Sequence, residues 1–230
     1  MNEADTTRVN KIIAHAIGLS RREVDTAISA GRVSINGEKA VMGSRVRPGD
    51  KVLYDGKPIT ERSDYTYLLL NKPAGYVCSR KRQGDVPTIY ELLNPEQTKL
   101  KAVGRLDKDS SGLLLLTDDG DFAHRMTHPK FHKQKTYIVA LDKDLEPLHQ
   151  QMISDHGIQL EDGPSKLMLE KLNDTDRAGW RVSMHEGRNR QIRRTFSSLG
   201  YEVTALHRTD FGPYNIGSLK PGTITPTTAL

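Results

Sequence analysis

The chain has 230 residues, of which 36% are hydrophobic and 27% are charged, and its net charge is +5. A chain of this length forms one or two domains and can bury roughly 70% of its unfolded surface without disulfides or metals. The single cysteine, Cys78, excludes a disulfide framework and a CxxC metal knuckle. No apolar run approaches the roughly 20 residues of a membrane span. We therefore expect a cytoplasmic protein that does not bind a membrane.

Charge is segregated along the chain. Residues 6–51 hold nine Lys/Arg against four acids, and residues 181–208 hold six against two. Residues 141–176 hold three Lys/Arg against nine acids. This pattern predicts a polyanionic partner that contacts both basic segments, with the acidic segment turned away from it. An ordinary solvated surface is the alternative interpretation.

Residues 1–60 are predicted to form a unit of their own, which begins with two helices. Apolar residues at helical spacing start at Val9, and Gly18 ends the pattern. Ser20 and Glu23 form a capping box for a second helix, and Gly31 stands where a C-terminal cap belongs. We expect two short helices joined by a tight turn.

Basic residues lie in and after the second helix, and turn signals follow it. Arg21 and Arg22 lie in the first turn of the second helix, where positive charges interact unfavourably with the helix dipole. Phosphates bound at this helix end would offset that cost, so the two arginines favour a phosphate ligand. Asn36-Gly37 between alternating residues predicts a β-hairpin. Residues 6–54 resemble the RNA-binding module first seen in a small-subunit ribosomal protein. The predicted RNA-binding residues of this α/β module are Arg8, Lys11, Arg21, Arg22, Arg32 and Lys39. A small α/β domain without a ligand is the alternative.

Residues 61–230 are predicted to form a larger α+β domain, with a mixed, mainly antiparallel sheet flanked by helices. The clearest helices are DGDFAHRMTH and NRQIRRTFSSLG, the second of which places Ile192, Phe196 and Leu199 on one face. The strand candidates are YLLL, GLLLLT, TYIVAL, SKLMLEKL, WRVSMH and YEVTALHRT.

The stretch GRLDKDSSGLLLLTDDG, residues 104–120, could be a metal loop, a catalytic carboxylate or a decorated strand. Five of its residues fit positions of an EF-hand calcium loop: Asp107, Asp109, Ser111, Gly112 and Asp118. Position nine is a leucine, the last ligand is Asp where Glu is expected, and the centre is four leucines. These departures disfavour calcium, and we expect no metal site.

A carboxylate on a turn into a buried strand, held by arginines away from water, can act as a nucleophile. GRLDKDSSGLLLLTDDG resembles the signature of the pseudouridine synthases, in particular their ribosomal-RNA branch. NKPAGYVCS, KTYIVAL and EGRNRQIRRTFSSLG resemble further motifs of that branch and occur in its order. Together with the N-terminal module, the resemblance spans nearly the whole chain.

The resemblance implies a role for each of four residues. Asp107 would be the nucleophile that attacks the target uridine, at the base or at the sugar carbon. Tyr137 would stack against the uracil near the departing proton, and Arg193 would pair with the nucleophile and aim it. Arg105 would enter the space left by the flipped base. Taken singly, Asp107 fits a turn, Tyr137 a core strand and Arg193 a phosphate contact.

The implied function is conversion of one uridine to pseudouridine in ribosomal RNA, 16S or 23S, by a monomer without a cofactor. A ribosomal assembly intermediate could be the substrate instead of free RNA. NKPAGYVCS favours the small-subunit enzymes and EGRNRQIRR their large-subunit relatives. A non-catalytic RNA-binding factor in ribosome assembly is the alternative. Arg188, Arg190 and Arg194 are predicted RNA contacts.

Three histidines recur every four residues in this half of the chain, at His124, His128 and His132. They could form a zinc face, but Pro129 would break the helix that aligns them, so we expect helix-end, RNA-facing residues. Cys78 is predicted to be a buried strand thiol.

Overall fold

The structure, a computed structural model, describes residues 6–60, 62, 64–173 and 175–230. Two compact units divide these residues. The first extends to Tyr65 and includes Asp118–Gly120, and the second comprises Thr66–Thr117 and Asp121–Leu230. The first unit therefore ends a few residues beyond the predicted boundary at residue 60. Among the described helices, none has the length and apolar character needed to cross a bilayer.

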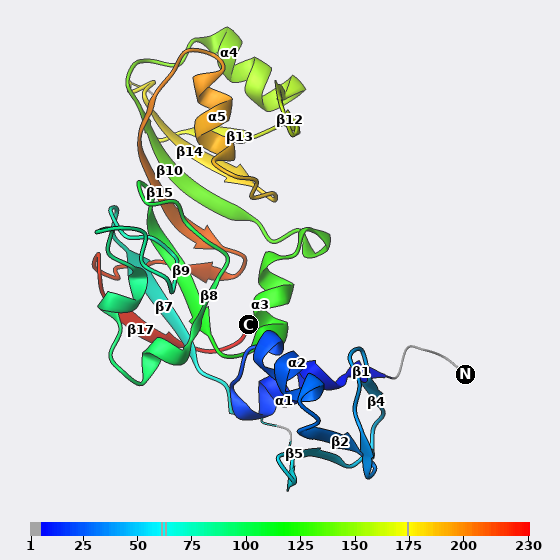
Figure 1. Cartoon of the computed structure of the whole chain (residues 1–230). Helices are drawn as coiled ribbons and strands as arrows, with labels where there is room; N and C mark the ends of the chain where they lie inside the picture. The colour runs from blue at the N-terminus through cyan, green and yellow to red at the C-terminus, as the bar shows by residue number, and fades with distance from the viewer. Residues whose placement is uncertain (1–5, 61, 63, 174) are drawn as a thin grey trace. The chain divides into compact units, whose positions relative to one another are not determined.

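The first unit consists of two helices and small antiparallel sheets (Figure 1). A four-stranded sheet has the order β3-β2-β5-β6 in the described residues, and β1 pairs with β4 separately. The bounds are β1 Thr7–Arg8, α1 Val9–Ile17, α2 Arg21–Ser29, β2 Val33–Ile35, β3 Glu38–Lys39, β4 Arg45–Val46, β5 Val52–Tyr54 and β6 Lys57–Pro58.

Local sequence signals determine where these helices start and stop. Gly18 adopts φ 76° and closes α1, because its backbone N–H donates to the carbonyl of Ala14 at 3.1 Å. The Ser20 hydroxyl accepts from the backbone N–H of Glu23, whose carboxylate accepts from the backbone N–H of Ser20 at 2.6 Å. Asn36-Gly37 joins β2 to β3 with positive φ at both residues. The predicted caps and hairpin are confirmed.

The second unit is built on a nine-stranded sheet in the part of the chain that the structure describes. Its main path is β13-β14-β10-β15-β9-β7-β17, with β16 paired to β15 and β8 to β9. Every pairing is antiparallel except that of β9 with β15. The bounds are β7 Tyr67–Lys72, β8 Lys101–Val103, β9 Ser111–Thr117, β10 Lys135–Leu141, β13 Met168–Lys171, β14 Gly179–Met184, β15 Val203–Phe211, β16 Tyr214–Asn215 and β17 Ile224–Thr227.

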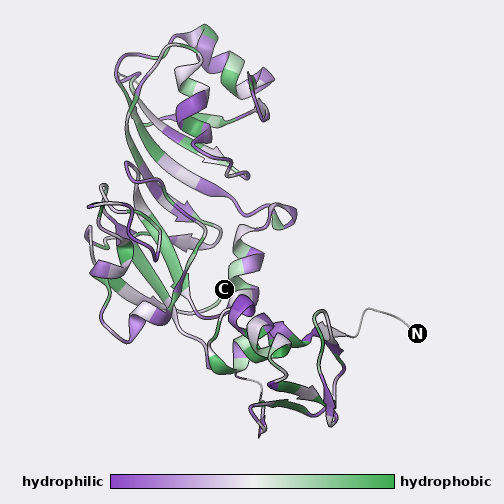
Figure 2. Cartoon of the chain, in the orientation of Figure 1, coloured by the Kyte–Doolittle hydropathy of each residue, from purple (hydrophilic) through white to green (hydrophobic). Residues whose placement is uncertain are grey.

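Strand β9 is buried on both faces, which explains its unbroken run of leucines. Leu113 and Leu115 pack in one apolar cluster with Phe122 of α3 (Gly120–Thr127). Leu114 and Leu116 pack in the larger cluster on the opposite face. Figure 2 shows the hydrophobic residues of β7 and β9 as neighbouring green strands. This core fixes the position of β9, which begins four residues after Asp107.

Further helices and a hairpin complete the second unit. Helix α5 packs Ile192 and Phe196 into the larger apolar cluster, while Leu199 is only half-buried. The remaining elements are α4 Pro147–Gln151, a π-helical turn at Met152–His156, the hairpin β11 Ile158–Leu160 with β12 Gly163–Ser165, and α5 Gln191–Ser197. Short 3-10 helices are η2 Ile89–Leu92, η3 Gln97–Lys99 and η4 Pro129–Phe131. The predicted α+β class is confirmed.

Two features of this unit differ from prediction. Strands β8, β11, β16 and β17 were not predicted, and β12 was missed except for Ser165, because these strands are short and lack clear alternation. Cys78 lies in a bend and is half-buried, where its Sγ accepts from the backbone N–H of Leu106 at 3.4 Å. Burial raises the pKa of this thiol. The prediction of a strand thiol is wrong.

Candidate active site

Asp107 lies on the turn 104–110, which joins β8 to β9. One edge of β9 is shared by two strands: β8 pairs along its last residues, and β15 pairs with Ser111 and Gly112 at its start. The turn therefore projects where β8 and β15 separate. Within it, the backbone N–H of Ser110 donates to the Asp107 carbonyl at 3.1 Å. The carboxylate stands on a short, internally bonded turn at the edge of a buried strand.

A buried lysine anchors this turn from beneath. Lys72 at the end of β7 is fully buried, and its Nζ donates to the carbonyls of Ser110 at 2.6 Å and Pro73 at 3.0 Å. The backbone N–H of Gly75 donates to the carbonyl of Lys108 at 2.7 Å. Burial lowers the pKa of Lys72. The NKPAG segment therefore supports the Asp107 turn, a role that the motif's order alone does not reveal.

Three neighbouring strands bring Tyr137, Arg208 and Gly112 into one row. Tyr137 on β10 is the register partner of Arg208 on β15, and Arg208 is the partner of Gly112 on β9. Directly opposed residues present their side chains on the same face of a sheet. Gly112 adopts φ +107°, and a Cβ there would lie 2.2 Å from the Arg208 carbonyl oxygen. Glycine is required for the parallel strand to approach so closely.

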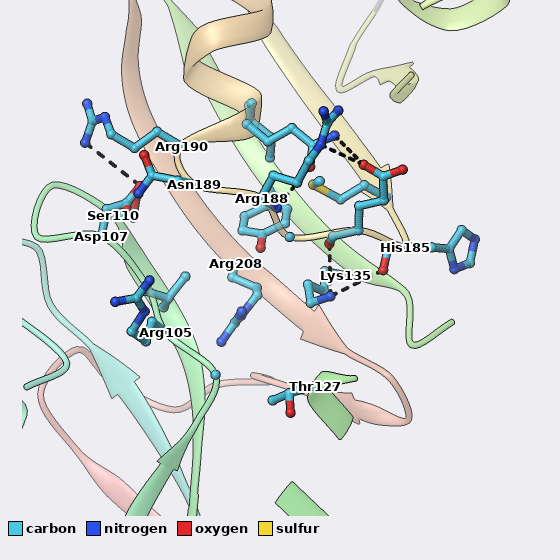
Figure 3. Close-up of a pocket in the computed structure, with 18 of the residues that line it drawn as sticks. Arg105, Asp107, Ser110, Thr127, Lys135, His185, Arg188, Asn189, Arg190 and Arg208 are labelled. Atoms are coloured by element: carbon cyan, nitrogen blue, oxygen red, sulfur yellow. Dashed lines mark hydrogen bonds and ion pairs between the residues drawn. The ribbon is translucent and has the colours of Figure 1, made fainter. Parts of the chain in front are cut away.

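The row opens into a cavity of about 850 Å³, which Figure 3 shows with its lining residues. This volume lies within the range of small-ligand sites. Arg105 and Asp107 lie on one side, His185 on the other, and Arg208 between them (Figure 3). Tyr137 lines the same cavity although it is only 7% exposed. Three predicted catalytic residues are thus brought together.

The fourth predicted catalytic residue, Arg193, is placed differently. Its Nη1 donates to the carbonyl of Val203 at 2.6 Å, and its Nη2 donates to the carbonyl of Asp109 at 3.1 Å. The guanidinium within ion-pair range of Asp107 belongs to Arg190, at 3.9 Å. The predicted ion pair of Arg193 with Asp107 is wrong in this structure. Helix α5 turns Arg193 toward the backbone of the Asp109 turn instead.

Arg188 and Arg194 bind a neighbouring hairpin. Arg188 donates to the Asp162 side chain at 2.9 Å and to the carbonyls of Gly163 at 3.0 Å and Pro164 at 2.7 Å. Arg194 forms a bidentate pair with Asp162 at 2.7 and 3.0 Å. These side chains fasten the β11–β12 hairpin to α5, and their role as phosphate contacts stays a prediction. Asp162 also lines the cavity, so this one of the nine acids in residues 141–176 is not turned away from the site.

In the first unit, the predicted RNA-binding residues differ in their surroundings. Arg32 forms a bidentate salt bridge with Asp55 and lies over the Tyr54 ring at 5.0 Å. Arg21 donates to the Asn10 side chain at 3.2 Å. Exposed side chains of Arg8, Arg22 and Lys39 also belong to this unit, while Lys11 is half-buried. Arg32 is therefore held by a structural partner within the module.

Two of the three histidines, His124 and His128, pack together at the end of α3. The rings of His124 and His128 are 4.7 Å apart, and both contact Phe131. Helix α3 ends at Thr127 and Pro129 starts η4, so the predicted break is confirmed. His132 lines the cavity, and its carbonyl lies 2.9 Å from His185 Nδ1.

The calcium-loop interpretation of residues 107–118 does not fit the fold. Ser111 begins β9, and this seven-residue strand places Asp118 roughly 20 Å beyond the Asp107 turn. Asp118 belongs to the first unit, where it forms an ion pair with Arg62 at 2.8 Å. Over residues 6–60, 62, 64–173 and 175–230, no cluster of three or more His, Cys, Asp and Glu could hold a metal ion.

Comparisons with known proteins agree with this geometry. The RNA pseudouridylate synthase family matches residues 66–198, and the S4 domain family matches residues 7–52. A crystal structure of a pseudouridylate synthase is 37% identical and superposes with a TM-score of 0.69, covering 96% of each chain.

Similar relatives come from both branches of ribosomal enzymes. Ribosomal small subunit pseudouridine synthase A of Yersinia pestis is 37% identical over 96% of this chain and 94% of its own. The enzyme of that name from Escherichia coli (strain K12) is 36% identical over 96% of each chain. Ribosomal large subunit pseudouridine synthase B of Bacillus subtilis (strain 168) is 35% identical over 94% and 89%. The chain belongs to the RNA pseudouridylate synthase family and is an isomerase that converts uridine in RNA to pseudouridine.

Sequence reasoning missed three cavity or turn residues. Lys72 hydrogen bonds to the backbone of the Asp107 turn, and Lys135 and Arg208 line the cavity. The quoted motifs contained Lys72 and Lys135, but a lysine in a strand motif gives no sign that it is buried. Only the register of β15 beside β9 reveals Arg208.

Proposed function

We propose that the substrate is ribosomal RNA, free or within an assembly intermediate, and that the target uridine enters the cavity beside Asp107. The observation that carries this proposal is the convergence of Asp107, Tyr137 and Arg105 on one cavity within the size range of small-ligand sites. The names of the small- and large-subunit relatives support a ribosomal substrate. The base must leave its stack to reach a carboxylate at the sheet edge.

Each lining residue then has a role. Asp107 is the nucleophile, and Tyr137 packs its ring against the uracil near the proton that leaves C5. Arg105 is exposed at the cavity and would occupy the space that the flipped base vacates. Arg190 faces the Asp107 carboxylate. Arg193 is a positioning residue, because it holds the carbonyl of Asp109 in the same turn.

The S4-like unit would contribute affinity for RNA through its exposed cations. Arg8, Arg21, Arg22 and Lys39 are exposed and can approach phosphates. We include Lys11 among the contacts, as a half-buried residue of the same helix pair. One chain carries both the cavity and this module, which supports action as a monomer. A ribosomal substrate supports a cytoplasmic location.

The test is chemical mapping of pseudouridine in 16S and 23S ribosomal RNA from cells with and without the gene. The proposal expects one modified position to disappear on deletion and to return when the wild-type gene is restored. The same maps decide between the two ribosomal RNAs. Unchanged maps in both RNAs would refute the ribosomal substrate.

A further inference from the structure

Two cations line the floor of the cavity beside Tyr137. Arg208 is 2% exposed, and its Nε donates to the Leu113 carbonyl at 2.8 Å. Its Nη2 is buried and has no hydrogen-bond partner among the described residues. Lys135 Nζ donates to the carbonyl of Glu186 at 3.0 Å. Both side chains contact backbone carbonyls, which carry no full charge.

Sheet register explains why these two cations lie together. Lys135 and Tyr137 are two residues apart on β10, so their side chains leave the same face of the strand. Arg208 is opposite Tyr137 on β15. The Phe211 ring lies beneath both cations, 5.4 Å from Lys135 Nζ and 4.8 Å from the Arg208 guanidinium. Figure 3 shows Arg208 and Lys135 side by side between Arg105 and His185.

Arg208 is buried and Lys135 is half-buried, and a cation removed from water without a counter-charge is unfavourable. Burial and the positive charge of Arg208 lower the pKa of Lys135 to about 8. Within the described chain, neither cation forms an ion pair with a carboxylate; Glu186 contributes its backbone carbonyl to Lys135 and its carboxylate to Arg188. Lys72 interacts electrostatically with Arg208. The other titratable or charged groups that line this cavity are Arg105, Asp107, His132, Asp162, His185, Glu186, Arg188 and Arg190. An anion that enters this floor would offset the cost.

The isomerisation produces an anion at this place. If Asp107 attacks the sugar carbon, the C1′–N1 electron pair leaves with the uracil and spreads over its two carbonyl oxygens. If Asp107 attacks the base at C6, the same ring becomes an enolate. In the sugar route, C5 then bonds to C1′ and displaces the Asp107 carboxylate from it. In the base route, the C1′–N1 bond breaks, C5 bonds to C1′, and Asp107 finally leaves C6. In both routes C5 loses its proton and N1 gains one, so the reaction is redox-neutral and Asp107 is regenerated. In both routes the uracil carries negative charge before product forms.

We propose that Lys135 and Arg208 form an electrostatic site that stabilises the negative charge on the uracil during isomerisation. The inference rests on the proposed entry of the target uridine into this cavity. Fixed charges aimed where charge develops are among the strongest contributions to catalysis. An RNA phosphate would be attracted by the same two cations, and its binding is the competing outcome.

The experiment measures single-turnover kcat, KM and RNA affinity across a salt series for full-length protein. The variants are Lys135→Met, Lys135→Arg and Arg208→Lys, with Lys130→Met as a charge-matched control outside the cavity lining. Near-ultraviolet circular dichroism checks the fold of each. Wild-type turnover of either ribosomal RNA is scored first, because an inactive wild type would contradict the proposed function and not this site.

We expect Lys135→Met to lower kcat by about 100-fold or more at saturating RNA, the scale of losing one such group. Its salt slope should match the wild type, and Lys130→Met should change kcat by less than about twofold. Lys135→Arg and Arg208→Lys, which keep the charge, should retain more activity than Lys135→Met. A slope reduced by about one with kcat retained would overturn the proposal in favour of a phosphate site.

The pH profile gives a readout that a packing role would not move. Wild-type kcat/KM should fall as pH rises through about 8, because the free enzyme's Lys135 loses its proton there. Lys135→Arg should shift this alkaline fall upward by at least about one pH unit, since guanidinium stays charged. Ionisation of the RNA itself would affect all variants equally. Identical alkaline limbs in wild type and Lys135→Arg would contradict the assignment.

Discussion

Arg190 Nη1 lies 3.9 Å from the Asp107 carboxylate and 3.1 Å from that of Asp109, so one guanidinium faces both acids of the turn. Arg190 adopts φ 45° at the N-terminus of α5, a left-handed conformation that is uncommon for a residue with a side chain. This backbone conformation directs the residue toward the turn. Arg193, one helical turn later, instead hydrogen bonds to the turn's backbone.

Substitution of Arg190 should therefore mainly affect kcat, and substitution of Arg193 should mainly affect the free energy of unfolding. We expect Arg190→Gln to fold with near wild-type stability, because the exposed ion pair of Arg190 with Asp107 is weak. The same substitution should lower kcat by roughly tenfold. Arg193→Gln should lower the free energy of unfolding by about 2 kcal/mol, because charged hydrogen bonds to two carbonyls are lost. Urea denaturation and single-turnover rates separate the effects. Equal stability losses in both variants would contradict this division.

Arg188 should act in stability and not in RNA affinity. Arg188→Gln removes its hydrogen bonds to the β11–β12 hairpin, which we expect to cost about 2 kcal/mol and lower Tm by roughly 4 to 8 °C. Arg181→Gln is the control, because its pair with Glu170 is exposed and should contribute little. Thermal unfolding and the salt dependence of RNA binding are measured. A flattened salt slope with unchanged Tm would restore Arg188 as a phosphate contact.

Gly112 should tolerate no side chain. In Gly112→Ala the new Cβ would lie 2.2 Å from the Arg208 carbonyl oxygen at φ +107°, so we expect a loss of at least about 3 kcal/mol from strain and overpacking. Gly200→Ala is the matched control, because Gly200 has φ +80° with open space around it. That variant should lose only about 1 to 2 kcal/mol. Comparable denaturation midpoints for the two would show that β15 is not packed tightly against β9.

The first unit should account for a defined part of the salt dependence. Replacing Arg21, Arg22 and Lys39 together with Gln should flatten the slope of log affinity against log salt by about two to three units. Arg32→Gln should leave the slope nearly unchanged, because Asp55 already holds that side chain. RNA binding is measured over a salt series with turnover at saturating RNA. A slope unaffected by the triple substitution would remove the module from RNA binding.

Local signals predicted much of the fold, and tertiary placement accounts for what they missed. The capping box at Ser20 and the Asn36-Gly37 hairpin act within a few residues, so sequence reveals them. The leucines of β9 were assigned to a sheet interior, as observed. Which arginine faces Asp107 depends on how α5 starts, and a left-handed Arg190 has no sequence signal.

Burial of charge was the other feature that sequence could not supply. From sequence, Arg208 is an ordinary strand arginine, and only the pairing of β15 with β9 shows that it is buried. Asp162 is one acid in an acidic segment, and only the tertiary structure shows its hydrogen bond with Arg188. Both depend on contacts between residues distant in the chain. Resemblance to a family ordered the motifs correctly, but it assigned Arg193 a contact that the geometry gives to Arg190.

The nucleophilic role of Asp107 is tested most directly by single-turnover conversion of a target ribosomal RNA by Asp107→Asn, with Asp109→Asn as the neighbouring control. Asparagine keeps the size of the side chain and removes its nucleophilicity. We expect Asp107→Asn to fold and to bind RNA with wild-type affinity. It should convert uridine at less than about a thousandth of the wild-type rate, which corresponds to a rise of roughly 4 kcal/mol in activation free energy. Asp109→Asn should stay within about tenfold of wild type. Turnover by Asp107→Asn above that thousandth, in protein that is folded and RNA-bound, would contradict the account.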